Sequence, residues 1–233
     1  MAVRALVFDT FGTLVDWRSG VAREAVRLLA DRAPGLDGGA FADAWRARYQ
    51  PSMETVRCGA RAFVDLDVLQ AESLEDVLGE FGVTGASDGT KSDLVQAWHR
   101  LDAWPDVPDA MERLRQRYLL APLSNGHVRL MVDLARRNGL VFDAILGAGY
   151  SRDYKPKPVL YRDAVAALGF ATGETLMVAA HSSDLAAAAA EGLATAHLAR
   201  PTENGPAGGE TGPSVPVTHA ARDLADLADR LGC

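Results

Sequence analysis

Three short apolar runs in this sequence end in polar side chains, and a fourth polar group precedes a predicted helix. A carboxylate at the tip of a buried strand lies where parallel α/β sheets bind ligands, outside the carboxyl ends of the strands. It is ionised at neutral pH, so it needs no base to act as a nucleophile. An aspartate that only turns the chain is an equally good interpretation of that tip alone. In chain order the polar groups are Asp9, Ser124-Asn125, Lys155, and His181 with Asp184.

The elements that must position these groups alternate between strand and helix. Strands are predicted over residues 4–8, 119–123, 142–146, 175–180 and 194–199. Helices are predicted over residues 107–118, 127–138, 158–168, 185–191 and 220–231. Such alternation indicates βαβ units and a parallel sheet, in which the polar strand tips meet at one edge. Pro122 weakens the prediction of the second strand, because proline cannot donate to a ladder, although it is tolerable near the end of a strand.

Residues 16–104 differ, because their apolar side chains repeat at helical spacing, as in Phe41, Trp45 and Tyr49. The first strand is needed to complete the later sheet, so this helical segment is an insertion. We predict an α/β protein with a Rossmann-like core of residues 1–15 and 105–233 and an all-helical cap of residues 16–104. The Gly/Pro-rich stretch 201–216 is predicted to be an exposed loop, with a mobile flap as the alternative.

Composition narrows the class of partner. The 233 residues are 48% hydrophobic and 24% charged, as in ordinary globular proteins, and the net charge is −7 without a basic face. Nucleic-acid binding is therefore not expected, and neither is a membrane span, since no run of about 18 apolar residues occurs. Cys58 and Cys233 are expected to be free thiols in a cytoplasmic protein without a signal peptide. The expected partner is a small molecule, and a homodimer stays open.

The order of the polar groups resembles the four-part signature of the haloacid dehalogenase superfamily, and the L-2-haloacid dehalogenase branch in particular. The inserted helices likewise resemble the cap of that superfamily. The resemblance implies hydrolysis of short 2-haloalkanoic acids to 2-hydroxy acids through an ester on the first aspartate. The matching segments are Phe8–Arg18 with Asp9 and Thr13, Trp45-Arg46, Ser124-Asn125-Gly126, Lys155-Pro156-x-Pro158-x-x-Tyr161, and His181-x-x-Asp184-Leu185.

The resemblance also implies roles in displacing the halide. Asp9 attacks the Cα of the 2-haloacid in line, and Thr13 hydrogen-bonds the carboxylate or adjacent backbone. Lys155, held by Asp184, keeps Asp9 ionised. Arg46 stabilises the leaving halide, for which Asn125 is a further candidate. Arg48, Arg57 and Arg61 compete with Arg46 for this role, and a plain surface position is its alternative.

Substrate binding is assigned in the same way. Ser124 and Asn125 hold the substrate carboxylate with nearby backbone N–H groups. This pair could also be an N-cap for the helix beginning near His127, which is compatible with binding an anion there. Tyr161 orients the substrate or is ordinary packing, and Phe11 lines an apolar pocket or the core.

Two residues compete to activate the water that hydrolyses the ester, Asp184 and His181. His181 also has a purely structural alternative. Better-known members carry Ser and Asn at the positions of Ala179 and His181. A pocket altered in this way could accept fluoroacetate.

Metal-dependent phosphatases of the superfamily carry acids at two positions that here are Phe11 and Ala180. Mg²⁺ prefers carboxylates, waters and phosphate oxygens in an octahedral arrangement. We therefore expect neither a metal nor another cofactor. The alternatives are a phosphatase or phosphonatase-like hydrolase of the same superfamily and a non-catalytic small-acid binder.

Overall fold

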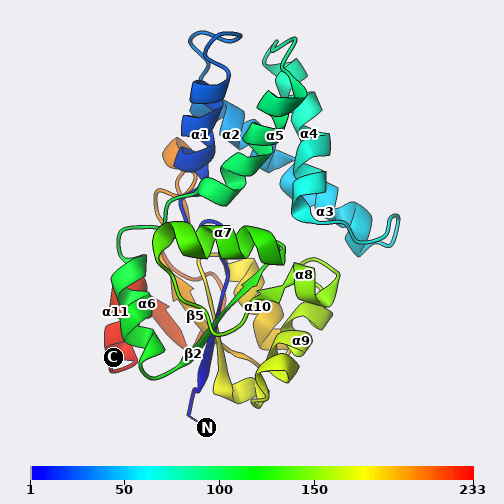
Figure 1. Ribbon diagram of the computed structural model, residues 1–233. Helices are drawn as coiled ribbons and strands as arrows, with labels where there is room; N and C mark the ends of the chain where they lie inside the picture. The colour runs from blue at the N-terminus through cyan, green and yellow to red at the C-terminus, as the bar shows by residue number, and fades with distance from the viewer. Residues whose placement is uncertain (1) are drawn as a thin grey trace. The chain divides into compact units, whose positions relative to one another are not determined.

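The computed structural model describes residues 2–233, which divide into two compact units (Figure 1). The first unit contains residues 2–16 and Asp102–Cys233, and the second is Trp17–Leu101. The chain thus leaves the first unit after Asp16 and returns to it at Asp102.

The first unit is built on a six-stranded parallel sheet with the order β3-β2-β1-β4-β5-β6, which confirms the predicted α/β fold. β1 is central because its apolar side chains are buried on both faces. Phe8 at its end pairs with Pro122 on one side and Val178 on the other. The tip of β1 therefore lies between the tips of β2 and β4. The strands are β1 Ala5–Phe8, β2 Leu119–Ser124, β3 Leu146–Gly147, β4 Thr175–Ala179, β5 Ala194–Leu198 and β6 His219–Ala221.

The strand predicted over residues 142–146 is wrong in extent, because β3 has only two residues. Asp143 takes the place of a ladder: its backbone N–H donates to Leu120 O at 2.8 Å, and its carboxylate accepts from Leu120 N at 2.9 Å. Pro122 is tolerated because successive residues of a strand direct their backbone polar groups to alternate sides. The nitrogen of Pro122 therefore faces the same side of β2 as that of Leu120, where few ladder bonds form. The short strand β6 was not predicted, and α11 begins at Leu224 because Asp223 caps it by accepting from Asp226 N at 2.7 Å.

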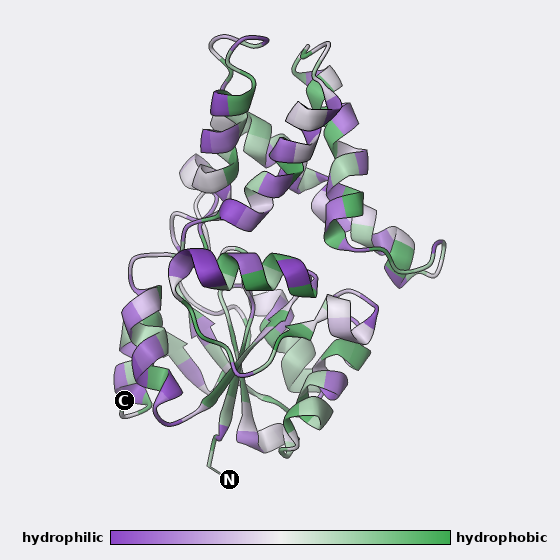
Figure 2. Cartoon of the chain, viewed as in Figure 1, coloured by the Kyte–Doolittle hydropathy of each residue, from purple (hydrophilic) through white to green (hydrophobic). Residues whose placement is uncertain are grey.

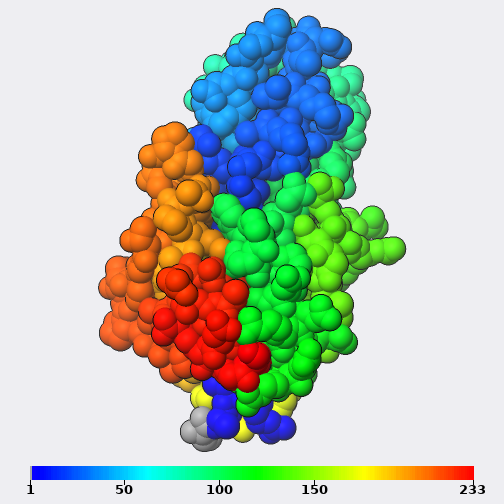
Figure 3. All heavy atoms as spheres, turned by 90° about the vertical axis from the view of Figure 1, so that its left-hand side faces the viewer, coloured from blue at the N-terminus to red at the C-terminus, as the bar shows by residue number. Residues whose placement is uncertain are grey.

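Helices cover both faces of the sheet (Figure 1). α6 packs against α11 on one side, and α9 packs against α10 on the other. Figure 3 shows α11, in red, lying against the green segment that includes α6. The strands in the middle of the sheet are mostly green, that is hydrophobic, in Figure 2, whereas the helices also carry purple hydrophilic stretches. The helices are α6 Val107–Arg115, α7 Val128–Asn138, α8 Ala148–Ser151, α9 Pro158–Leu168, α10 Ser182–Ala190 and α11 Leu224–Arg230, with 3-10 turns η2 Thr172–Glu174 and η3 Gly205–Ala207.

The second unit is helical and has an aromatic core. Trp45 packs edge-on against Phe41 and Trp98, with ring centroids 6.0 and 5.6 Å apart, and Trp98 stacks on Trp17. Among the described residues, no helix of either unit has the length and apolar character needed to cross a membrane. The elements are α1 Trp17–Leu28, α2 Gly38–Ala47, α3 Tyr49–Arg57, α4 Leu66–Glu80, α5 Asp88–Val95 and η1 Gln96–Arg100.

Candidate active site

Asp9 lies directly after β1, and its backbone N–H donates to Val178 O of β4 at 3.0 Å. Its side chain is buried, with 7% of the residue exposed. Thr13 fixes this carboxylate, because its hydroxyl donates to Asp9 Oδ2 at 2.7 Å and accepts from Ala180 N at 2.9 Å. The turn after β1 is thereby tied to the end of β4, and the carboxylate is aimed by two neighbouring strands.

Lys155 stands between two carboxylates. Its Nζ lies 2.7 Å from Asp9 Oδ1 and 2.5 Å from Asp184 Oδ2, and the residue is only 6% exposed. Asn125 places the lysine, because its side-chain oxygen accepts from the backbone N–H of Lys155 at 2.8 Å. Asn125 and Asp184, from two other segments of the chain, thus hold the Lys155 ammonium beside Asp9, the candidate nucleophile.

This arrangement keeps Asp9 ionised. Burial by itself raises the pKa of Asp9, but the Lys155 ammonium and His181 outweigh it and hold the pKa well below its usual range. Burial likewise opposes the charge of Lys155, yet Asp184 and Asp9 together raise the pKa of Lys155 above its ordinary value. A buried carboxylate that keeps its charge is suited to nucleophilic attack.

Asp184 is held from its other side by Tyr161, whose hydroxyl donates to Oδ1 at 2.6 Å. Tyr161 is fully buried. Burial and the charge of Asp184 raise the pKa of Tyr161, so the hydroxyl keeps its proton and donates. This contact lets Tyr161 orient Asp184, and through it Lys155, whereas direct contact with substrate stays a prediction.

Ser124 and Asn125 lie at the end of β2 and are both buried. Ser124 Oγ accepts from Gly126 N at 3.1 Å, and α7 begins later, with His127 at its N-cap position. The prediction that this pair is the N-cap of the helix is therefore wrong, because His127 occupies that position. Because Asn125 uses its oxygen for Lys155 N, its amide nitrogen remains to donate toward an anion.

His181 faces Asp9 and also an acid that sequence reasoning missed, Glu203. His181 Nδ1 lies 3.3 Å from Asp9 Oδ2, and Nε2 lies 3.0 Å from both carboxylate oxygens of Glu203. Glu203 is 3% exposed, so the prediction that residues 201–216 form an exposed loop is wrong at this position. A single glutamate in a Gly/Pro-rich stretch gives no sequence signal, because its burial depends on contacts with distant residues.

Arg200 anchors the segment that carries Glu203. Its guanidinium donates to both carboxylate oxygens of Asp106, at 2.8 and 2.9 Å, and Nε donates to Thr13 O at 3.0 Å. Glu203 N in turn donates to Arg200 O at 3.1 Å. The segment is therefore fastened beside the turn after β1, which disagrees with the mobile-flap alternative.

Phe11 and Ala180 offer no side-chain oxygen to a metal. Phe11 is 2% exposed, and the backbone N–H of Ala180 is engaged by Thr13. The two remaining carboxylates, Asp9 and Asp184, are bridged by the Lys155 ammonium, so a positive charge already lies between them. The donor set therefore does not fit the octahedral oxygen ligation that Mg²⁺ requires.

Arg46 belongs to the helical unit, and its guanidinium carbon lies 4.0 Å from the ring centroid of Tyr49 and 5.1 Å from that of Trp17. Its Nη1 is buried and has no hydrogen-bond partner within residues 2–233. The competing arginines form ion pairs: Arg48 with Glu80, Arg57 with Glu54, and Arg61 with Glu72. Within this set and the described residues, Arg46 is the arginine with a buried, unpartnered nitrogen that can donate to an anion.

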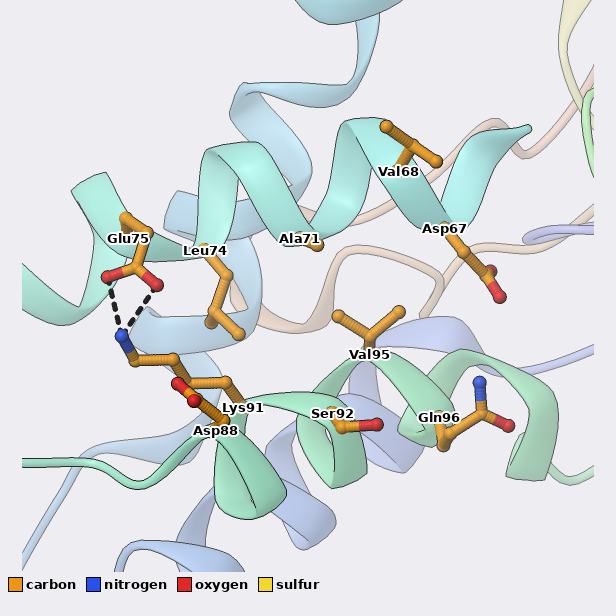
Figure 4. A pocket seen from close by; sticks show the side chains of 10 residues that line it. All are labelled: Asp67, Val68, Ala71, Leu74, Glu75, Asp88, Lys91, Ser92, Val95 and Gln96. Carbon is orange, nitrogen blue, oxygen red and sulfur yellow. Dashed lines mark hydrogen bonds and ion pairs between the residues drawn. The ribbon is translucent and has the colours of Figure 1, made fainter. Parts of the chain in front are cut away.

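The helical unit also contains a groove of about 420 Å³ between α4 and α5 (Figure 4). Val68, Ala71, Leu74 and Val95 form its apolar part, and the ion pair of Lys91 with Glu75 lies at one end. None of the predicted site residues lines this groove. It is a separate feature from the carboxylates at the strand tips.

Comparison with known proteins gives a consistent result. The family model of the haloacid dehalogenase-like hydrolases matches residues 3–192 of this chain. The chain is 30% identical to (S)-2-haloacid dehalogenase 4A of Burkholderia cepacia, over 97% of this chain and 94% of the relative.

Solved structures agree with this similarity. The defluorinating L-2-haloacid dehalogenase Rha0230 has a TM-score of 0.95 and 44% identity, over 99% of this chain and 96% of that chain. An L-2-haloacid dehalogenase from Xanthobacter autotrophicus with chloropropionic acid covalently bound has a TM-score of 0.83 at 26% identity, over 99% of this chain and 98% of that chain.

Proposed function

The chain belongs to the haloacid dehalogenase-like hydrolases, and we propose that it hydrolyses short 2-haloalkanoic acids to 2-hydroxy acids and halide. The observation that carries this proposal is the Asp9 carboxylate, buried and paired with Lys155 at 2.7 Å. The similarity to (S)-2-haloacid dehalogenases supports the substrate class. A cytoplasmic location and a homodimer stay predictions.

The first step is displacement of halide by Asp9. The carboxylate attacks Cα in line, the carbon–halogen bond breaks, and an ester forms between Asp9 and an inverted Cα. Lys155 and Thr13 hold the carboxylate in place for this attack. The chloropropionic acid covalently bound to the Xanthobacter autotrophicus relative supports an ester intermediate.

The second step is hydrolysis of this ester. Water attacks the carboxyl carbon of Asp9, which releases the 2-hydroxy acid without a further change at Cα. Attack at that carbon regenerates the Asp9 carboxylate for the next cycle.

Two groups of residues bind the anions of the reaction. Ser124 and Asn125 receive the substrate carboxylate at the end of β2, where buried donors compensate for the nearby charge of Asp9. Arg46 binds the leaving halide through Nη1, which has no hydrogen-bond partner among the described residues. The similarity to the defluorinating Rha0230 further supports fluoroacetate as a substrate.

Halide release from chloro-, bromo- and fluoroacetate in the presence of EDTA tests the proposal. We expect chloride and bromide from the wild type, none from Asp9→Asn, and wild-type rates from Asp229→Asn, which changes an exposed carboxylate. Absence of halide from all three acids contradicts dehalogenation. A fluoride electrode that records nothing with fluoroacetate contradicts only the extension to that substrate.

Stereochemistry and isotope labelling test the ester. (S)-2-Chloropropionate should give (R)-lactate, because one displacement inverts Cα. In a single turnover in H₂¹⁸O, the label should enter the Asp9 carboxylate and not the lactate hydroxyl. Label found directly in lactate would mean that water attacks Cα itself.

A further inference from the structure

His181 is enclosed by two acids that come from segments far apart in the sequence. Asp9 follows β1 and faces Nδ1, whereas Glu203 follows β5 and faces Nε2. A histidine placed in this way has one nitrogen directed at the reacting carboxylate and the other held by a second carboxylate. This is the geometry of a base whose tautomer is set by an acid behind it.

We propose that Glu203 is a positioning residue that holds His181 as the base which activates water for hydrolysis of the ester on Asp9. This inference rests on the proposed function and assigns its second step to two residues. Glu203 acts through His181 and does not contact the reacting atoms.

The fold provides a defined place for Glu203. Gly12 has φ +85°, and a Cβ at this position would lie 2.0 Å from Glu203 Oε1, so the absence of a side chain leaves room for the carboxylate. Arg200 and Glu210 fasten the segment on either side. Arg200 does so through Asp106, and Glu210 through Ser182, whose N–H donates at 2.9 Å. A carboxylate this buried and this constrained is preorganised.

Asp184 is a weaker candidate for the same role. Its Oδ2 accepts from Lys155 and its Oδ1 accepts from Tyr161, so both oxygens are occupied by donors. His181 Nδ1 instead faces the Asp9 carboxylate, which is the group that changes during the reaction.

The charge of His181 changes as the reaction proceeds. Burial lowers the pKa of His181, but the hydrogen bonds and charges of Asp9 and Glu203 outweigh it and raise the pKa to about 10. His197 of β5 is a further ionisable neighbour. In the resting enzyme His181 is therefore an imidazolium. When Asp9 becomes an ester it loses its charge, and the Nδ1 proton loses the anion that retained it.

The proton transfers during ester hydrolysis return His181 and Asp9 to their resting states. The Nδ1 proton leaves to solvent after the ester forms, while Glu203 keeps the proton on Nε2. Nδ1 then accepts a proton from water as the hydroxide oxygen bonds to the Asp9 carboxyl carbon. The tetrahedral centre expels the alkoxide, which takes the remaining proton of the new carboxyl group. The products are the 2-hydroxy acid, the Asp9 carboxylate and the imidazolium of the resting state.

Rapid-quench kinetics with chloroacetate tests the inference in the intact protein. Glu203→Gln keeps the size of the side chain and removes its charge. We expect a burst of one chloride per enzyme at close to the wild-type rate, followed by ester decay about 100-fold slower than in the wild type. Intact-protein mass spectrometry should show the ester accumulating. Glu203→Asp, which retains the charge, should recover part of the decay rate.

Glu112→Gln is the control, because it changes an exposed glutamate of α6 that takes no part in holding Glu203 or His181. Its ester should decay at the wild-type rate. NMR titration of labelled histidine should show a lower His181 pKa in Glu203→Gln than in the wild type, because the carboxylate that favours the imidazolium is gone. An unchanged chloride burst with slowed ester decay is the result that a merely structural role would not produce.

Two results overturn the inference: ester decay in Glu203→Gln at the wild-type rate, or equal slowing of the chloride burst and of ester decay. A wild-type protein that releases no chloride and forms no ester contradicts the proposed function instead. The two failures are therefore distinguishable.

Discussion

The ammonium group of Lys155 lies 2.7 Å from Asp9 Oδ1, and both residues are buried. Removing this cation leaves Asp9 and Asp184 as two buried carboxylates without a positive charge between them. Breaking a buried pair in this way destabilises a protein by about 3–5 kcal/mol. It also raises the pKa of Asp9, because burial then acts with less opposition.

Lys155→Met should therefore lose halide release by about 100-fold or more and unfold at a lower urea concentration. Lys157→Met changes the lysine two positions along the same segment and is the control. Halide release and urea unfolding measured for both variants check the prediction. A Lys155→Met protein with wild-type activity would show that Asp9 does not need this cation.

Tyr161→Phe removes the hydroxyl that donates to Asp184 at 2.6 Å. We expect the free energy of unfolding to fall by about 1.5–3 kcal/mol, the usual contribution of a hydrogen bond to a charged group. Activity should fall as well, because Asp184 then holds Lys155 less firmly. Tyr150→Phe is the matched control, since Tyr150 is 52% exposed. Equal unfolding free energies for the two variants would contradict a structural contribution from this hydrogen bond.

Arg46→Gln tests the arginine whose Nη1 is unpartnered among the described residues. Loss of a cation that stabilises the departing halide should slow the chloride burst by about 100-fold. Arg48→Gln is the control, because Arg48 is paired with Glu80 at 2.7 Å and should not affect the burst. If the burst slows in Arg48→Gln and not in Arg46→Gln, the assignment of the halide ligand is wrong.

The sequence was most informative where local chemistry decides the structure. Helix α9 spans Pro158–Leu168 as predicted, because a proline suits the first helical turn and Gly169 at φ +71° ends the helix. β1 could likewise be predicted from an apolar run that ends in a carboxylate. The extent of β3 could not, because Asp143 replaces part of its ladder through a bond to Leu120 that no local pattern encodes.

The candidate site shows the same difference between features set by local sequence and features set by distant contacts. Asp9 and Asp184 could be predicted to approach each other because β1 and β4 are neighbours, with Asp9 directly after β1 and Asp184 in the first turn of α10 after β4. Glu203 could not, because its place depends on room beside Gly12 and on the anchoring of Arg200 by Asp106. The resemblance to a family predicted the roles of the site residues, whereas only the packing in the structure identified Glu203 as the partner of His181.

The Asp106–Arg200 ion pair predicts a stability difference that depends on pH. Burial raises the pKa of Asp106, but the hydrogen bonds and charge of Arg200, with the Leu224 N–H, outweigh it and lower the pKa below its ordinary 3.8. A lowered folded-state pKa stabilises the protein above the unfolded value, and this stabilisation is lost as pH falls through the folded value. Asp106→Asn should therefore lower the free energy of unfolding by about 3 kcal/mol at pH 7.

That difference from the wild type should shrink as the pH falls below 3.8, where Asp106 begins to be protonated in the unfolded chain. Urea unfolding at a series of pH values checks this, with Asp229→Asn as the exposed control. Because Arg200 also holds Thr13 O and the segment of Glu203, Asp106→Asn should slow ester decay at pH 7 as well. A stability difference that stays constant down to acid pH would mean that the charge of Asp106 contributes nothing and that only its hydrogen bonds matter.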